Sequence, residues 1–282
     1  MLSIALVVMM GKIGRRGRES YPKLAVKPTF LQDAEAVVDP VMRVFQFWAV
    51  LIFLCMPMTS QTSMTACSNP SSEILASSVL HEIVLNAGRP APEWESATPV
   101  TFCADWQGMN SDPSRQTRVR ALWSPDTLYL RFECRYRELH LFSDSDPSGR
   151  RDRLWDRDVV EAFLQPDPSR PNAYKEFEVS PNGFWIDLDI SPGAKPDLKS
   201  GLKRSVVLDE AAHRWTAALA IPMKALTAQF EPSAVWRVNF YRVEGKEEPR
   251  GYYAWQPTRT PQPNFHVPSA FGCMRFTEVN KK

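Results

Sequence analysis

Apolar and mostly charged residues alternate almost without exception from Thr127 to Arg137. An extended chain points successive side chains to opposite faces, so a period of two residues predicts a β-strand with one buried and one wet face. A similar alternation begins at Trp215 and again at Trp236. The buried face of the first strand is expected to carry Leu128, Leu130, Phe132, Cys134 and Tyr136.

Turn signals between such runs predict a succession of hairpins. Pro181-Asn182-Gly183 separates Tyr174–Ser180 from Phe184–Ile190, and an Asn-Gly pair supplies the positive φ angles that a tight hairpin needs. The second run predicts two rows of side chains: Phe184, Ile186, Leu188 and Ile190 inward, and Trp185, Asp187 and Asp189 outward.

About ten short strands, one helical turn over Met223–Ala228 and no long helical stretch indicate an all-β domain. The expected fold is an immunoglobulin-like or jelly-roll antiparallel β-sandwich over residues 79–282, long enough for one substantial core. The net charge is +2 and Lys and Arg are scattered, so nucleic acid is not an expected partner.

The chain before this domain has the features of an export signal. The apolar run Val44–Met56 is shorter than the roughly 20 residues that span a bilayer, and it fits the hydrophobic region of a signal peptide over residues 42–66. Residues 1–41 are then an N-terminal extension outside the native product, with translation from Met42. The expected location is periplasmic, outer-membrane or extracellular.

The end of this signal resembles the lipobox of bacterial lipoproteins, Met64-Thr65-Ala66-Cys67. The resemblance implies acyl chains on Cys67 as the one attachment to a membrane, with residues 67–78 as a linker. Ordinary cleavage near Ala66 and full secretion is the alternative. In an oxidising compartment, two of Cys103, Cys134 and Cys273 could pair, or they could be buried free thiols.

A loop with Trp155 runs into the apolar strand Val159–Leu164. Three carboxylates accompany it, Asp156 and Asp158 before the strand and Glu161 within it. Sugars present apolar C–H faces and a rim of hydroxyls, so a flat aromatic ring beside fixed acceptors fits sugar recognition. Phe265 lies on a second loop and could complete a sandwich around one ring. The pattern predicts a binding module and not an enzyme.

Over about residues 80–280 the chain resembles the family 9 carbohydrate-binding modules and their DOMON-like sandwich relatives. The resemblance rests on these motifs in order: Trp155 with Glu161 six residues later, Glu176–Val179, Trp215, Ala220–Pro222, Trp236–Arg242, Tyr253–Pro257 and Phe271-Gly272. In that family two loop tryptophans enclose a terminal sugar, and an acid in the following strand bonds its hydroxyls.

The resemblance implies a role for each matching position. Trp155 and Glu161 match the first aromatic residue and the acid, Phe265 stands in the place of the second tryptophan, and Gln262 in that of a binding amide. Glu178 stands where well-known members have a basic residue. The implied partners are mono-, oligo- or polysaccharides and associated glycoside hydrolases. The only cofactor implied is structural calcium, with Asp187 and Asp189 as candidates; a solvated strand face is the alternative.

Several alternatives stay open from the sequence. Glu161 bonds either a ligand or an internal partner such as Arg242, which is itself a candidate ligand-binding residue. Asp187 and Asp189 also match half of the acidic motif of jelly-roll glycosidases, although a third acid is missing. A haem-binding relative would need axial ligands such as Met223 and His266; otherwise His266 is a surface-loop residue. An envelope module without a sugar ligand is the last alternative.

Overall fold

The computed structural model describes residues 71–143, 149–246 and 250–278; the predicted extension, signal peptide and Cys67 lipidation site lie outside them. The strands are β1 (Glu73–Ser78), β2 (Val100–Phe102), β3 (Thr117–Ser124), β4 (Thr127–Arg135), β5 (Val159–Gln165), β6 (Tyr174–Val179), β7 (Trp185–Ile190), β8 (Lys203–Asp209), β9 (Arg214–Pro222), β10 (Val235–Glu244), β11 (Gly251–Ala254) and β12 (Gly272–Thr277). The helical segments are α1 (Met223–Leu226) and the 3₁₀ turns η2 (Pro92–Glu95), η3 (Pro113–Arg115), η4 (Leu154–Asp156) and η5 (Pro268–Ala270). None of the helices in these ranges is long and apolar enough to cross a bilayer.

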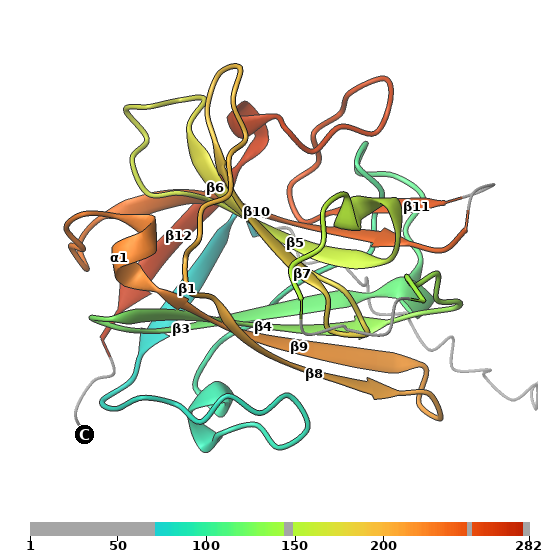
Figure 1. The fold of residues 1–282 in the computed structure, drawn as a ribbon, viewed down its shortest axis with the longest axis horizontal. Helices are drawn as coiled ribbons and strands as arrows, with labels where there is room; N and C mark the ends of the chain where they lie inside the picture. Colours follow the sequence, from blue (N-terminus) through green and yellow to red (C-terminus); the bar gives the residue numbers. More distant parts are fainter. Residues whose placement is uncertain (1–70, 144–148, 247–249, 279–282) are drawn as a thin grey trace, which may run out of the picture. The chain divides into compact units, whose positions relative to one another are not determined.

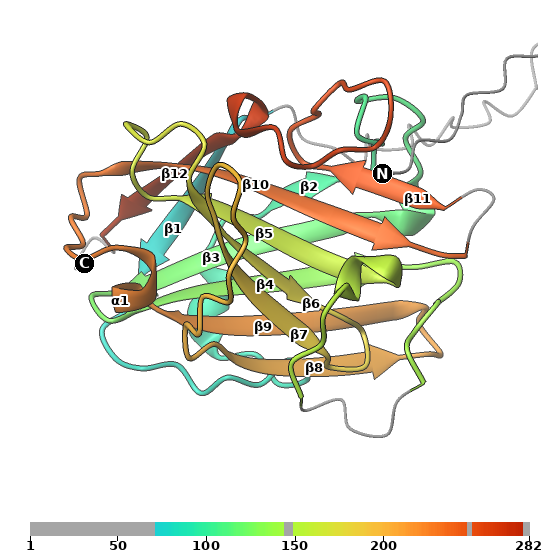
Figure 2. The same ribbon diagram turned by 45° about the horizontal axis from the view of Figure 1, so that its top comes forward.

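The strands form one strongly curled sheet in the order β7-β6-β5-β10-β12-β1-β3-β4-β9-β8, with β11 beside β10 and β2 beside β3. Figures 1 and 2 show β3, β4, β9 and β8 in one layer and β6, β5 and β10 crossing it in the other. The predicted all-β sandwich is confirmed. Its pairings are antiparallel except at β1, which pairs in parallel with both β12 and β3.

Strand β1 joins the two layers, although the sequence assigns its residues to the linker 67–78. Ile74 and Ala76 are buried in the main core, at 1% and 0% exposure, while Leu75 between them is 37% exposed. Three apolar residues within a serine-rich stretch are a weak signal for a strand. The position of β1 between β12 and β3 is a tertiary property, because both neighbours come from much later in the chain.

The main core fills the space between the layers. The expected buried rows of β4, β9 and β10 all point into it, as the alternation predicts. Phe132 on β4 meets Phe240 on β10 edge to face, with ring centroids 5.7 Å apart. The row on β9 that begins at Trp215 lies in the same cluster, so these predictions are confirmed.

A second apolar cluster lies on the other face of β5, β6, β7 and β10. The row Phe184, Ile186, Leu188 and Ile190 is buried as expected, but in this second cluster and not in the main core. Asp187, expected to face outward, is fully buried and accepts hydrogen bonds from the backbone N–H and the hydroxyl of Ser200. Both faces of β7 are covered, so alternation alone could not identify the one that faces the main core.

The three cysteines of the domain do not form a disulfide with one another. Cys134 and Cys273 are free thiols, and Cys103 is disulfide-bonded. Burial raises the pKa of the Cys134 thiol to about 11, so this side chain acts as a small apolar core residue. Of the two alternatives left by the sequence, the buried free thiol therefore holds for Cys134.

Candidate functional site

Trp155 is held on the surface by the short turn η4. Leu154 is fully buried and anchors the turn, whereas Trp155 keeps 40% of its surface exposed. The Arg250 guanidinium donates hydrogen bonds from Nη2 to the carbonyl oxygens of Trp155, at 2.5 Å, and Arg157, at 2.9 Å. The turn therefore fixes the backbone beneath an accessible indole, and the loop position expected for Trp155 is confirmed.

A cavity of about 330 Å³ lies beside this indole. Its lining comes from η4, from strands β5, β6, β10 and β11, from Lys195 after β7, and from residues 263–266. Small-molecule sites in proteins are typically roughly 300–1,000 Å³, so the cavity suits a ligand of a few rings at most.

Three glutamates that line this cavity form what we call the glutamate cluster: Glu161, Glu176 and Glu178. Glu161 on β5 lies directly opposite Glu178 on β6, and Glu176 follows on the same face two residues away. One oxygen from each carboxyl group lies within 4.8 Å of the others. All three are buried, at 3%, 2% and 0% exposure in sequence order. Like charges opposite each other across a strand pair are destabilising, so the arrangement costs the fold stability.

The cluster lacks a counterion within bonding distance among the described residues. No Lys or Arg there forms an ion pair with it, and the nearest basic group is the His266 ring, 3.9 Å from Glu176. Among the described residues, no group outside the cluster donates a hydrogen bond to either oxygen of Glu178. Burial, and then the neighbouring carboxylates, raise the pKa of Glu161 and Glu178 well above the usual value; burial also raises the pKa of Glu176. The cluster therefore retains protons at pH values where an exposed glutamate is ionised.

Lys195 is bonded to His266 and not to the glutamates. Its ammonium donates to His266 Nε2 at 2.9 Å. Because an ammonium only donates, Nε2 accepts, and the neutral ring carries its proton on Nδ1, 2.6 Å from the Tyr174 hydroxyl. Burial, and then Lys195, lower the pKa of His266 to about 4, so the ring is neutral at physiological pH.

Four of the predicted site residues meet in this cavity: Trp155, Glu161, Glu178 and Phe265. Phe265 is only 8% exposed, because its ring stacks on Tyr241 with centroids 4.2 Å apart and planes 12° apart. The Tyr241 hydroxyl also donates to the Phe265 carbonyl at 3.0 Å. The expected sandwich between two open aromatic faces is therefore absent from the described structure, and Trp155 supplies the exposed face.

Gln262 and Arg242 lie outside the cavity. Gln262 is exposed, and its carbonyl accepts a hydrogen bond from Thr260. Arg242 is fully buried on the main-core side, 5.0 Å from the Trp215 ring and paired with Glu244 at 3.3 Å. Glu161 lies opposite Tyr241, the neighbour of Arg242, so Glu161 and Arg242 point to opposite faces of the sheet. The alternative in which Glu161 pairs with Arg242 is therefore wrong.

The acids considered for calcium binding or hydrolysis have other partners. Asp187 is bonded to Ser200, and Asp189 pairs with Lys175 at 2.7 Å. These two carboxylates do not face each other as a hydrolytic pair requires. Met223 and His266 line different cavities, which removes the axial pair of the haem alternative.

Several cavity residues are not assigned to the site by the sequence: Glu176, Lys195, Arg250, Tyr252, Asn264 and His266. His266 lies in a loop with 37% of its side chain exposed, as expected, and its ring also stacks on Phe163 with centroids 5.3 Å apart. Glu176 could have been predicted from Glu178, because residues two apart in a strand lie on the same face. The others come from loops or short strands, where no period applies.

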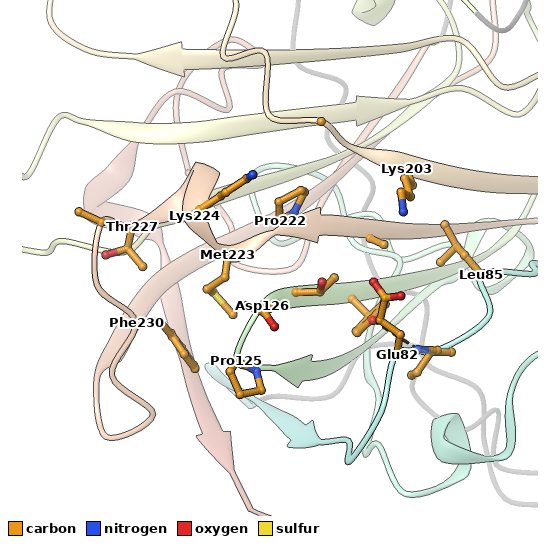
Figure 3. Close-up of a pocket in the computed structure, with 16 residues that line it drawn as sticks. Glu82, Leu85, Pro125, Asp126, Lys203, Pro222, Met223, Lys224, Thr227 and Phe230 are labelled. Carbon is orange, nitrogen blue, oxygen red and sulfur yellow. Dashed lines mark hydrogen bonds between the residues drawn. The ribbon is translucent and has the colours of Figure 1, made fainter.

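A larger hollow of about 550 Å³ lies on the outer face of β4 and β9 (Figure 3). Lys203, Lys224 and Glu82 are among its lining residues. Its aromatic rings are packed against protein: Tyr129 is 2% exposed, and Phe230 meets Trp123, Trp236 and Phe276 edge to face. No ring there offers an open face comparable to Trp155.

We expect Glu178→Gln to stabilise the fold at about pH 8. The substitution removes one charge from a buried cluster, and the new amide can donate to the remaining carboxylates. A raised folded-state pKa gives stability that is present at low pH and lost as pH rises through it, so the gain should shrink towards about pH 5. A gain of about 1 kcal/mol raises the unfolding temperature by roughly 2–4 °C, measurable by calorimetry.

The exposed Glu82→Gln serves as the control for that measurement. A surface substitution of this kind changes stability by less than about 0.5 kcal/mol. An unfolding temperature of Glu178→Gln below that of the parent chain at the higher pH would show that the cluster does not strain the fold.

Known proteins resemble this chain in sequence and in fold. The sequence profile described as carbohydrate family 9 binding domain-like matches residues 87–279. "Extracellular protein" of Arthroderma benhamiae is 27% identical over 175 residues, 56% of this chain and 78% of the relative.

Two solved structures share the fold. A Bacteroides uniformis protein named as a candidate carbohydrate-binding protein has a TM-score of 0.59 at 18% identity, with 73% of this chain and 99% of that chain covered. A family 9 carbohydrate-binding module of Caldicellulosiruptor kristjanssonii, solved with cellotriose, has a TM-score of 0.53 at 16% identity, with coverage of 74% and 95%. The profile match spans most of the domain, and this chain therefore belongs to the carbohydrate family 9 binding domain-like family.

Proposed function

We propose that this protein binds a sugar or polysaccharide non-catalytically in the cavity beside Trp155. The observation that carries the proposal is a 40% exposed indole next to a 330 Å³ cavity that also contains three carboxyl groups. An indole face packs against the apolar side of a sugar ring, and carboxyl groups accept its hydroxyl hydrogen bonds. Cellotriose in the related bacterial module is a first ligand to test.

The geometry favours binding without hydrolysis. Two-carboxylate glycosidases place an acid and a base or nucleophile on either side of the scissile bond. The glutamate cluster projects from one face of two adjacent strands, so its carboxyl groups lie side by side. A ring resting on Trp155 would meet all of them from the same side. Chromogenic glycosides should therefore remain intact when incubated with the protein.

The proposal includes export and partner enzymes. The predicted signal over residues 42–66 and the name of the fungal relative support a location outside the cytoplasm. Acylation of Cys67 would tether the domain to a bacterial membrane. A non-catalytic sugar-binding protein in that place would work alongside separate glycoside hydrolases. Inhibition of lipoprotein signal peptidase should leave the signal peptide attached and raise the mass of the protein, whereas an unchanged mass would support ordinary cleavage near Ala66.

Trp155→Ala is expected to weaken binding of the best glycan by about tenfold or more, which corresponds to ~1.4 kcal/mol. The physical reason is loss of the exposed stacking face. A glycan array followed by titration calorimetry gives the measurement. Unchanged affinity in Trp155→Ala would rule out this cavity as the site.

Trp155→Phe provides the matched comparison, because it keeps a smaller ring at the same position. Its affinity should fall between those of the parent chain and Trp155→Ala. The unfolding temperature should be the same in all three proteins, since the side chain is largely outside the packed clusters. A graded loss of affinity without a stability change would separate ligand contact from a folding defect.

A further inference from the structure

The glutamate cluster is more acidic than a neutral sugar requires. Hydroxyl groups can be bonded by neutral amides and backbone groups, which cost less to bury than carboxylates. Here three carboxyl groups line one small cavity, and both oxygens of Glu178 are buried without a hydrogen-bond donor from outside the cluster among the described residues. A positively charged ligand would offset the repulsion between these carboxyl groups, whereas a neutral ligand would not.

We propose that the cavity selects a sugar bearing a protonated amino group, with the ammonium held by the glutamate cluster and the ring against Trp155. This inference rests on the proposed function and names the chemical class of its ligand. An ammonium has three or more N–H donors and no acceptor, so it matches a set of carboxylate oxygens and repels none of them.

The spacing of the cluster fits such a group. Charge-assisted N–H···O bonds are about 2.7–2.9 Å long, and acceptors placed tetrahedrally around one nitrogen at that distance are about 4.6 Å apart. The three carboxyl groups offer oxygens that all lie within 4.8 Å of one another. They come from neighbouring strands in fixed register, so little ordering is needed on binding.

The rest of the cavity favours an organic cation over a metal ion. Its volume of about 330 Å³ far exceeds the space of one ion, and an exposed indole forms part of the lining. Indole faces attract ammonium groups as well as C–H faces. Lys195 and Arg250 also line the cavity, and they would repel a divalent ion more strongly than a single ammonium charge.

The charges around the glutamate cluster are compatible with the binding of one more cation. The ionisable groups around it are Asp156, Glu161, Glu176, Glu178, Lys195, Arg250, His266, Tyr174 and Tyr241. Asp156 pairs with Arg153 at 2.8 Å, so the three carboxyl groups of the glutamate cluster face Lys195 and Arg250, while His266 and both tyrosines are neutral at physiological pH. A bound ammonium would replace a proton retained by the cluster, and that proton would be released on binding.

Three β-1,4-linked trisaccharides that differ only at carbon 2 test this directly: cellotriose, the glucosamine trisaccharide and the N-acetylglucosamine trisaccharide. Titration calorimetry of the full chain at about pH 6, where the free amine is protonated, should show the glucosamine ligand bound about tenfold or more tightly than either neutral ligand. Repeating the titration in two buffers of different ionisation enthalpy should show proton release for the glucosamine ligand alone.

Glu178→Gln and Trp155→Ala separate this inference from the proposed function. Glu178→Gln should weaken binding of the glucosamine ligand more than that of the neutral ligands and so remove the preference for the amine; Trp155→Ala should weaken all three. Equal or tighter binding of a neutral trisaccharide by the parent chain would overturn the amino-sugar inference and leave carbohydrate binding intact. No binding of any glycan would overturn both. Saturable Ca²⁺ binding that is lost in Glu178→Gln would overturn the inference in favour of a metal site.

Discussion

Deleting Glu73–Ser78 from the full chain is expected to abolish cooperative folding. The segment is strand β1, which pairs with β12 on one side and β3 on the other, and so connects the two layers. Its removal would expose two sheet edges and open the main core at Ile74 and Ala76. Urea titration followed by near-ultraviolet circular dichroism should show no cooperative transition for the deleted chain.

Single substitutions in β1 provide a graded version of this test. Ile74 is 1% exposed and Leu75 is 37% exposed, so two neighbouring residues of equal size differ mainly in burial. Ile74→Ala should cost about 2–5 kcal/mol, as large-to-small core substitutions do, and Leu75→Ala clearly less. Equal losses for the two substitutions, or a deleted chain that still unfolds cooperatively, would show that β1 is peripheral to the fold.

Arg242→Met is expected to destabilise the protein by about 3–5 kcal/mol, the usual cost of removing one partner from a buried charge network. Glu244 and Asp158 are both fully buried, and Arg242 is a cation for each of them. Methionine keeps a similar apolar stem but removes the positive charge that stabilises the two buried acids. Chemical denaturation gives the measurement. Arg237→Met on the same strand should cost only roughly 1 kcal/mol, because Arg237 is half-buried and bonds two loop carbonyls.

The loss in Arg242→Met should grow with pH. Burial raises the pKa of Asp158 to about 6 even with Arg242 nearby. A raised folded-state pKa gives stability that is lost as pH rises through it, and without Arg242 this pKa would be higher still. The variant should therefore be closer to the parent chain at about pH 5 than at about pH 8. A pH-independent loss would indicate a packing defect. Adding Glu244→Gln should recover part of the stability.

Alternation was enough to predict the strands and much of the core. The rows beginning at Leu128 and Trp215 lie in the main core as a period of two predicts, although the other faces of β4 and β9 are largely buried as well. The same rule failed at Asp187, since β7 is covered on both faces. It also missed β1, whose burial depends on strands far away in the sequence.

The candidate site was predictable in part for the same reasons. Trp155 stands outside any alternating run, which indicated a surface position, and Glu161 shares a face with Phe163 by period alone. Arg242 follows an apolar row and could not be assigned a partner without the strand register, which places it on the face opposite Glu161. Phe265 was expected as an open stacking face, but its packing on Tyr241 depends on how a loop folds back.

The amino-acid sequence by itself determined the all-β class, the inward rows of β4, β9 and β10, and the exposed tryptophan, because each follows from local period and turn chemistry. Only the tertiary structure decided that Glu161 and Glu178 face each other, that Lys195 and His266 come near them, and that β1 joins the layers. The register of paired strands and the path of a loop across the sheet depend on contacts between distant segments. No local pattern specifies which acids will share one buried cavity.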